Sequence, residues 1–385
     1  MRHTLLLLTA MCWLVYGLTS RSAGGTEPVL TRIPRGAVQP QVLVDEQGSA
    51  HLVYFKGEPK AGDVFYASRA SGAEAFSTAI RINSEPGSAI AAGSIRGAQM
   101  ALGRDGRVHV AWNGSGKAIG HNGAPMLYAR QKDDRSGFET QRDLMTFSGG
   151  LDGGGSIAAD REGNVYVIWH GNTPATAGKE ERRTVFLAAS GDHGRTFEAE
   201  RSIDPDHTGA CGCCGLKAFA DHSGSLFVLY RAAKAGSERD EVLITSTDKG
   251  RSFHRVFAHP WTSMVCPMSS AWLGSGRDAA MEIAWEKSGQ VWFARFDPQG
   301  AKFPDPVAPL GGGQRKHPVA IGNSQGQTLL VWDEGTGWER GGSLAWQTFD
   351  ANGKPVGELG RREGIPVWSF AAAAVRQDGQ FEIFY

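Results

Sequence analysis

The sequence predicts an all-β protein: a β-propeller of four-stranded blades, with seven blades favoured and six as the alternative. Glycine makes up 52 of the 385 residues, about twice its usual share. Hydrophobic residues contribute 41%, with 18 phenylalanines and 11 tryptophans among the residues. This composition favours many short strands joined by tight turns and disfavours a helical bundle. A strand–turn–strand pattern also recurs along the chain at a nearly fixed period, which is typical of a propeller.

The chain begins with a segment that reads as a secretory signal. Arg2 and His3 provide a small positive start, residues 5–18 are apolar, and small residues follow. The apolar stretch is shorter than the roughly 20 residues of a transmembrane helix. We therefore predict that residues 1–22 are a signal peptide, and that residues 23–385 form a single propeller domain that is secreted or periplasmic.

The repeated unit is a strand, a tight turn that contains a glycine, and a second strand that ends in an aromatic residue. Its first copy runs from residues 42–44 to residues 50–54. In six copies the aromatic residue follows the turn glycine by six positions: Gly48/Tyr54, Gly106/Trp112, Gly163/Trp169, Gly224/Tyr230, Gly326/Trp332 and Gly379/Tyr385. A further copy ends at Trp285, so the seven aromatics recur about every 55 residues. We expect each copy to form the inner pair of strands of one blade.

The outer strands and the two ends of the chain complete the predicted ring. Residues 63–67 and 77–82 are expected to be the outer strands of the first repeat. Residues 29–33 read as a lone outer strand, and the chain closes with an inner pair alone, residues 370–376 and 381–385. A last blade shared between the two ends would close the ring and remove its open edges.

Two hairpins between third and fourth strands carry a sharper signature. Residues 190–197 and residues 246–253 both fit the pattern S-x-D-x-G-x-[ST]-[FW]. In such a turn the Asp side chain bonds turn amides, the glycine accepts a positive φ, and the aromatic residue packs between sheets. The pattern resembles the Asp-box (BNR) repeat of the sialidase superfamily, which implies a β-propeller. In that family the repeat is structural and lies away from the active site, so it does not itself indicate sialidase chemistry.

The predicted blades place a candidate site on one face. The ends of second strands and the starts of first strands meet there, around the central axis. The residues that follow the aromatics are polar or charged: Lys56, Asn113, His170, Arg231, Glu286, Asp333 and Glu334. The first-strand starts add Arg96, Cys214, Cys266, Lys316 and His317. Because such a rim suits a small ligand or a sugar, we predict ligand-binding roles for Arg96, Arg231, Lys56, His170, Asp333, Lys316 and His317.

The charge balance restricts the partners. Forty basic residues balance forty acidic ones, so the formal charge is zero. Nucleic-acid binding normally needs a basic excess, and we predict no nucleic-acid partner. No later segment is long and apolar enough to span a bilayer. The sequence also lacks a P-loop, a dinucleotide fingerprint and a serine nucleophile elbow. We expect a monomer that binds a glycan or a small acidic ligand.

The resemblance to sialidases implies a chemistry for the rim. Enzymes of that family bind the substrate carboxylate with three arginines, and they use a tyrosine–glutamate nucleophile pair with an aspartate acid/base. Carried over to this sequence, the resemblance implies Tyr230 with Glu286 as the nucleophile pair and Asp63 as the acid. It also implies Arg96 and Arg231 as two of the three arginines.

Spacing alone fixes none of these assignments. Tyr54 is the alternative nucleophile, and Thr31-Arg32-Ile33-Pro34 looks like the segment that carries the family's first arginine. Counting back from the turn glycines places Arg32 on an outer strand instead. Two hypotheses follow: an exported sialidase-like propeller that binds, and in its stronger form hydrolyses, a glycan, and a non-catalytic propeller that binds a glycan or a protein.

The cysteines support a third hypothesis. Removing the signal peptide removes Cys12 and leaves four cysteines: Cys211, Cys213, Cys214 and Cys266. An even number in an exported chain favours disulfides, and no cofactor is then expected. The alternative is a metal or redox site. Thiolates favour copper or zinc, with further ligands from His207, His259, Met268 or His317. A strained bridge between the adjacent Cys213 and Cys214 would be redox-active.

Overall fold

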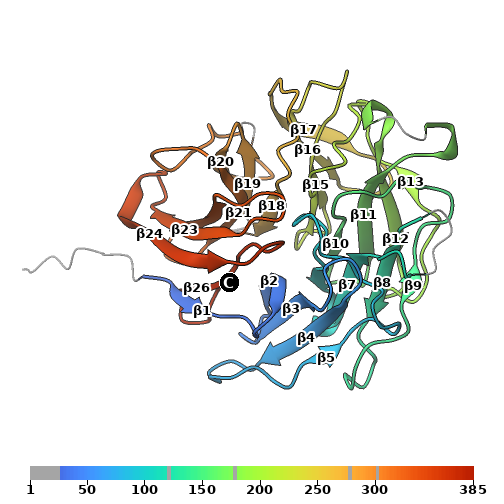
Figure 1. The fold of residues 1–385 in the computed structure, drawn as a ribbon, viewed down its shortest axis with the longest axis horizontal. Helices are drawn as coiled ribbons and strands as arrows, with labels where there is room; N and C mark the ends of the chain where they lie inside the picture. The colour runs from blue at the N-terminus through green and yellow to red at the C-terminus, as the bar shows by residue number, and fades with distance from the viewer. Residues whose placement is uncertain (1–26, 119–122, 177–179, 276–279, 301–302) are drawn as a thin grey trace, which may run out of the picture.

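The structure is a computed structural model that describes residues 27–118, 123–176, 180–275, 280–300 and 303–385. The predicted signal peptide and its Cys12 lie outside these ranges. Within them, the strands form seven sheets arranged as blades around one axis (Figure 1). Five of these sheets have four strands and two have three. The prediction of a seven-bladed propeller is confirmed, and the six-bladed alternative is wrong.

Blades I to IV follow one another along the chain, each with its innermost strand first. Blade I contains β2 (Ala37–Val44), β3 (Ala50–Lys56), β4 (Asp63–Arg69) and β5 (Ile80–Arg81). Blade II contains β6 (Gln99–Leu102), β7 (Val108–Asn113), β8 (Met126–Arg130) and β9 (Arg142–Asp143). Blade III contains β10 (Ser156–Ala159), β11 (Val165–Gly171), β12 (Thr184–Ser190) and β13 (Arg201–Ser202). Blade IV contains β14 (Lys217–Ala220), β15 (Leu226–Arg231), β16 (Glu241–Ser246) and β17 (His254–His259).

Blades V to VII complete the ring. Blade V contains β18 (Trp272–Ser275), β19 (Met281–Lys287) and β20 (Gln290–Phe296). Blade VI contains β21 (Arg315–Gly322), β22 (Thr328–Glu334), β23 (Gly342–Phe349) and β24 (Pro355–Ile365). Blade VII contains β25 (Ala372–Val375), β26 (Phe381–Phe384) and β1 (Val29–Thr31). The described connections also hold short 3-10 helices: η1 (Arg104–Gly106), η2 (Pro174–Thr176) and η3 (Glu180–Arg182).

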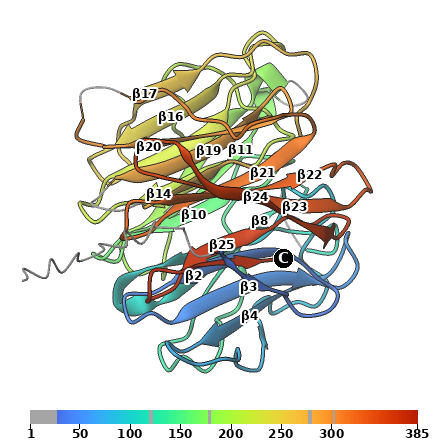
Figure 2. The same cartoon turned by 90° about the vertical axis from the view of Figure 1, so that its left-hand side faces the viewer.

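Blade VII joins the two ends of the described chain, as predicted. β1 is its outer strand and pairs in parallel with β26. The Glu382 side chain of β26 accepts a hydrogen bond from Thr31 Oγ1 at 2.6 Å and pairs with Arg69 of blade I. Arg32 follows β1, with its guanidinium 4.8 Å from the ring centre of Tyr385. Figure 2 shows β25 beside β2, where the last blade meets the first.

The core lies between the blades. All seven repeat aromatics are buried there, none more than 6% exposed: Tyr54, Trp112, Trp169, Tyr230, Trp285, Trp332 and Tyr385. Every residue of β7, β11 and β15 is buried. The second strand of a blade is covered by neighbouring blades on both faces, so both sets of its alternating side chains are buried. In the described residues no helix is long and apolar enough to cross a membrane.

The two turns at residues 190–197 and 246–253 share one hydrogen-bond pattern. In the first turn, Ser190 Oγ accepts from the Gly194 amide at 2.9 Å, and Asp192 Oδ1 accepts from the Thr196 amide at 2.8 Å. The second turn repeats these bonds at 2.8 and 2.9 Å. Gly194 has a φ of 73°, which favours glycine. The signature therefore shapes the turn, as its local chemistry predicts.

The axis holds two cavities that share lining residues. A cavity of about 820 Å³ lies at the end where first strands turn into second strands, and a cavity of about 40 Å³ lies nearer the opposite end. Gln41, Lys217 and Trp272 line both cavities. Lys217 Nζ donates to Gln99 Oε1 at 2.7 Å and lies 4.9 Å from the Trp272 ring centre. Burial lowers the pKa of Lys217 to about 7.

Candidate functional site

The predicted convergence of first-strand starts is observed. The small axial cavity is lined by one such residue from every blade: Pro40, Ile95, Gly155, Gly215, Ser270, His317 and Phe370. We call this end of the propeller, where the second strands also finish, the axial face. The first-strand starts of all seven blades therefore meet here, at the place that the repeat predicts, and of the predicted ligand-binding residues His317 lines this cavity.

Backbone segments fill the centre of the axial face. Arg96 Nε donates to the Asp152 carbonyl oxygen at 2.6 Å, and Arg96 Nη2 pairs with Asp152 Oδ1 at 2.7 Å. A Cβ atom at Gly153 would lie 2.6 Å from carbonyl oxygens of both Gly212 and Cys214. Glycine is therefore required where this segment meets residues 211–215, which we call the cysteine loop. Of the residues that were expected to line an open mouth, His170 lies beside both segments.

Arg231 is buried and is engaged by the protein itself. Its guanidinium is 3.1 Å from a Glu241 oxygen and 3.9 Å from a Glu286 oxygen. Arg231 Nη1 donates to the Arg239 carbonyl oxygen at 3.0 Å. Burial raises the pKa of Glu241 to about 7, although the nearby Arg231 opposes this effect. Arg231 thus neutralises internal carboxylates, and its side chain is only 4% exposed.

The structure gives Tyr230 and Glu286 separate partners. The Tyr230 hydroxyl bonds Thr208 Oγ1 at 2.9 Å and Asp204 Oδ1 at 3.2 Å. Glu286 Oε1 accepts from the Gly289 amide at 2.6 Å. Burial, together with the negative charge of Asp204, raises the pKa of Tyr230. These contacts do not form the tyrosine–glutamate pair that the resemblance implies.

The other implied catalytic groups also have structural partners. Tyr54 stacks on Phe65 with ring centres 5.8 Å apart, and burial raises its pKa. Asp63 Oδ1 accepts from Asn83 Nδ2 at 2.7 Å and from the Gly87 amide at 2.8 Å. Asp63 therefore holds the connection between blades I and II.

Some of the remaining predicted ligand-binding residues are buried, and others reach solvent. His170 and His317 are buried, and burial lowers the pKa of both, that of His317 to about 3. His170 Nε2 lies 3.2 Å from a carbonyl oxygen of the cysteine loop. Asp333 is fully buried, which raises its pKa well above the ordinary value. Lys56 is exposed and Lys316 is half-buried. Of the predicted set, Lys56, Lys316 and Arg96 reach solvent.

Sequence reasoning missed a pair of tryptophans on this face. Trp338 lies in the connection from β22 to β23, and Trp368 lies just before β25. Their ring centres are 4.8 Å apart at an interplanar angle of 81°, and Trp338 is 58% exposed. A Cβ atom at Gly93 would lie 2.7 Å from Arg96 Nη1 and 3.6 Å from Trp338 Cζ3, so Arg96 and Trp338 border the same glycine. The sequence feature that could have identified this pair is that both tryptophans lie outside the repeat position.

The four described cysteines are free. The structure shows no disulfide among them, and disulfide pairing in an exported chain stays a prediction. Cys211, Cys213 and Cys214 place their sulfurs together, and Cys213 also neighbours Cys266 and Glu180. Burial raises the pKa of the Cys214 thiol. Hydrogen bonds from Cys211 and Cys213 and the positive charge of Arg231 outweigh this effect and hold that pKa well below its usual value.

The histidines suggested as further metal ligands have other surroundings. His259 Nδ1 accepts from the Trp285 indole at 2.8 Å, and His317 Nδ1 accepts from the Ser270 amide at 3.2 Å. Among the described residues, the groups of His, Cys, Asp and Glu donors close enough to share an ion contain cysteines and Glu180, and no histidine.

Comparison with known proteins identifies the fold. No family model matches the chain, and no curated protein matches it in sequence. A Hadza microbial sialidase, Hz136, superposes with a TM-score of 0.52 at 13% identity, over 78% of this chain and 63% of the sialidase. An α-L-arabinanase from Penicillium chrysogenum, complexed with arabinobiose, gives 0.52 at 12% identity over 83% and 95%. A protein of unknown function from Dyadobacter fermentans gives 0.51 at 13% identity over 80% and 93%. The chain is thus a sialidase-like β-propeller in fold.

Proposed function

We propose that this chain is an exported, monomeric propeller that binds a glycan on its axial face, at Trp338 and Trp368. The observation that carries the proposal is this tryptophan pair beside an arginine, in which Trp338 is exposed and Trp368 is half-buried. Fold analogy supports it, because similar propellers include a sialidase and an arabinanase complexed with arabinobiose. Export rests on the signal-like residues 1–22.

The tryptophan pair has the chemistry of a sugar platform. Trp338 is among the most exposed large apolar side chains of the described residues. Its edge-to-face contact with Trp368 fixes the orientation of both rings. An indole ring presents a flat apolar face while its N–H remains free to bond, which suits the apolar C–H face and the hydroxyl rim of a pyranose. Exposed apolar surface of this kind marks interaction sites.

Arg96 lies beside the tryptophan pair and favours a sugar that carries an acidic group. Asp152 holds the guanidinium through its carbonyl and its carboxylate, and the Ala92 carbonyl oxygen accepts from Nη1. The orientation of Arg96 is therefore fixed before a ligand arrives, and one hydrogen on each Nη nitrogen is left for the ligand. The Arg96 side chain is 19% exposed. A fixed guanidinium bonds a carboxylate with little loss of side-chain freedom. We therefore favour a glycan that carries a carboxylate near the sugar ring that stacks on Trp338.

The proposal is for binding rather than hydrolysis. Tyrosine-based retaining hydrolysis needs an activated tyrosine within reach of the sugar. Tyr230 is buried, bonded to Asp204, and shifted away from the phenolate form. Arg231, the second implied arginine, is occupied by Glu241 and Glu286. A protein ligand on the same face is the competing outcome of the test below.

A glycan array followed by titration calorimetry tests the proposal. The mature chain is screened against neutral and carboxylate-bearing oligosaccharides, and the best ligand is titrated against variants. We expect Trp338→Ala to weaken binding by about tenfold or more, as for an aromatic residue that anchors an interface. Arg96→Gln should weaken acidic ligands more than their neutral counterparts.

Phe147→Ala is the matched control, because it removes another exposed aromatic ring, in the connection between blades II and III, that packs on Phe186. It should leave the affinity unchanged. Two results contradict the proposal: a wild-type chain that binds none of the glycans, or a Trp338→Ala variant that is folded and binds with undiminished affinity.

A further inference from the structure

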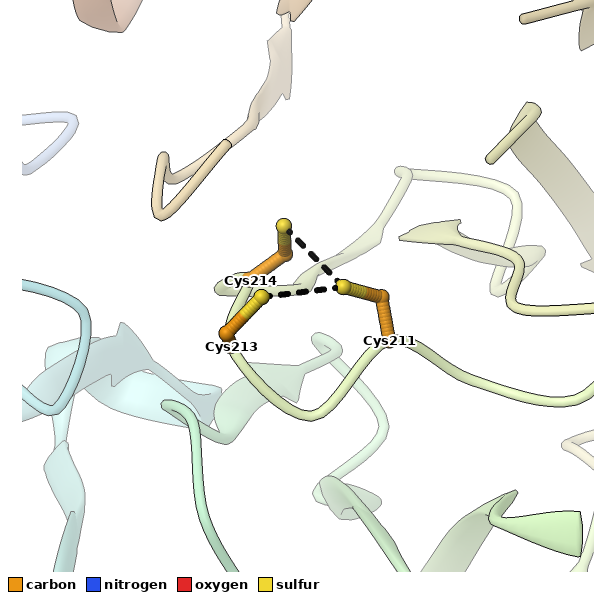
Figure 3. Close-up of side chains that lie close together, drawn as sticks. All are labelled: Cys211, Cys213 and Cys214. Carbon is orange, nitrogen blue, oxygen red and sulfur yellow. Dashed lines mark hydrogen bonds between the residues drawn. The ribbon is translucent and has the colours of Figure 1, made fainter. Parts of the chain in front are cut away.

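The cysteine loop brings three thiols together on the axial face. Cys211 Sγ lies 3.2 Å from Cys213 Sγ and 3.5 Å from Cys214 Sγ. Figure 3 shows the three side chains converging from one turn of the chain. All three sulfurs lie within 4.8 Å of one another. Four thiolates bound to one metal ion at about 2.3 Å are separated from one another by about 3.8 Å, so this spacing is close to that of a shared ion.

A fourth thiol comes from the segment that leads into blade V. Cys266 Sγ lies within 4.8 Å of both Cys213 Sγ and a Glu180 carboxylate oxygen. Cys266 is exposed and Cys213 is half-buried, so an ion has access from solvent. Thiolates are soft donors and select Cu⁺ and Zn²⁺ over hard ions. We propose that the three thiols of the cysteine loop bind one d¹⁰ metal ion: Cu⁺ through these three alone, or Zn²⁺ with Cys266 as the fourth ligand.

Buried arginines supply the positive charge that a thiolate site needs. The charge of Arg231 acts on Cys214, and that of Arg239 acts on Cys211. Both arginine side chains are only 4% exposed. In the part of the chain that the structure describes, Arg231 Nε and two nitrogens of Arg239 have no hydrogen-bond partner. Such donors are costly when buried beside neutral groups. Arg231 pairs with Glu241 and Glu286, and Arg239 pairs with Glu180. Thiolates would place further negative charge beside the nitrogens that these carboxylates leave unbonded.

A disulfide accounts for less of this arrangement. A single bridge within the loop would use two of the three converging sulfurs and leave the third outside the bond, where Cys211 or Cys214 would be buried and Cys213 half-buried. It would also remove the thiolate charge that adds to Glu241, Glu286 and Glu180 beside these two arginines. A bound ion uses all three sulfurs and keeps thiolate charge near both guanidinium groups.

Metal analysis on the mature chain tests the site. Untagged protein is purified anaerobically with reductant, loaded separately with Zn²⁺ or with chelator-buffered Cu⁺, and desalted. Metal content and thiol count are then measured on the same samples. We expect one equivalent of Cu⁺ or Zn²⁺ per chain and sulfur neighbours at about 2.3 Å in the X-ray absorption spectrum of the Zn²⁺ form.

Cys213→Ser is the most informative variant, because Cys213 is half-buried and belongs to both donor groups. It should lose the bound ion while its far-ultraviolet circular dichroism stays that of wild type. Cys266→Ser should lose Zn²⁺ and keep Cu⁺. His222→Ala is the control: it removes an exposed histidine at the opposite end of the axis and should keep one equivalent.

Three results would overturn the proposal. One is a reduced, folded wild-type chain that retains neither ion. Another is a Cys213→Ser variant that binds the ion as wild type does, because the ion would then lie elsewhere. The third is secreted protein with intact disulfides among these cysteines and no bound metal. Glycan binding is measured separately, so failure of the metal site leaves the proposed function untouched.

Discussion

Tyr230 and Arg231 are neighbours in β15, yet they face different blades. Side chains alternate along a strand, so Tyr230 packs toward blade III with Asp204, while Arg231 reaches Glu286 of blade V. The repeat correctly located both residues at the end of a second strand. It could not show which neighbour each would meet, because Asp204 lies in the irregular connection from β13 to β14 and Glu286 lies in β19 of another blade. A catalytic pair was therefore out of reach of the sequence at this position.

Replacing Tyr230 with phenylalanine tests the structural role assigned to its hydroxyl. The variant loses the bonds to Thr208 and Asp204, so we expect its free energy of unfolding to fall by about 1 kcal/mol in urea denaturation. Tyr54→Phe is the matched control and should change stability less. A fluorogenic sialoside supplies the second readout. Turnover by wild type that disappears in Tyr230→Phe would identify a nucleophile and contradict the role proposed here.

Lys217 predicts a pH dependence of stability. Its pKa is about 7 in the folded chain and about 10.4 when unfolded, so the unfolded state binds more protons between these values. The Lys217 contribution to the unfolding free energy should therefore rise as the pH increases from about 7 to about 10. Below pH 7 both states are protonated, and the cost of burying the charge is fully present.

Comparison with Lys217→Met isolates this effect. The variant should be more stable than wild type near pH 7, and its advantage should shrink as the pH approaches 10. Lys234→Met is the control, since Lys234 is largely exposed, and it should differ from wild type equally at every pH. A pH-independent difference for Lys217→Met would show that Lys217 is charged throughout in the folded state.

At the scale of elements, the sequence predicted strands and turns best where the same turn residues repeat along the chain. The inner hairpins and the turns at residues 190–197 and 246–253 lie where the pattern predicts them. Outer strands were less predictable: residues 77–82 were expected as a strand, and only β5 (Ile80–Arg81) pairs with β4. An outermost strand has one neighbour, so short pairing satisfies it and leaves little hydrophobic pattern to detect.

Asp192 shows what the repeated turn contributes. Hydrogen bonds from the Thr196 hydroxyl and amide and from Ser190 lower its pKa to about 2, although partial burial opposes them. We expect Asp192→Ala to lower the melting temperature by a few degrees, because the turn loses its central acceptor. Glu198→Ala, an exposed change in the same connection, should have little effect. Equal melting temperatures for wild type and Asp192→Ala would show that the turn forms without this side chain.

Ring closure is the feature of the whole molecule that the sequence predicted best. The lone strand near the start and the inner pair at the end could only be satisfied together. The filling of the axial face was not predictable in the same way. It depends on the paths of the cysteine loop and of residues 152–155. The close contact between Gly153 and the Cys214 carbonyl oxygen does not recur from blade to blade, so the sequence repeat cannot predict it.

Glu382→Gln tests the closure. Glu382 is buried and joins blade VII to Arg69 of blade I, so the amide would leave Arg69 without its counter-charge. We expect a loss on the order of 3 kcal/mol in the free energy of unfolding, with one cooperative transition retained. Glu58→Gln, at an exposed position of blade I, serves as control. A loss no larger than that of the control would mean that this pair does not hold the ring together.

The central claim, that the axial face binds a glycan, is tested most directly by a crystal structure of the mature chain soaked with the best ligand from the array. The account predicts a sugar ring stacked on Trp338, next to Trp368, with an acidic substituent bonded to Arg96. Sugar density confined to the large cavity at the opposite end of the axis, with Trp338 uncovered, would contradict it.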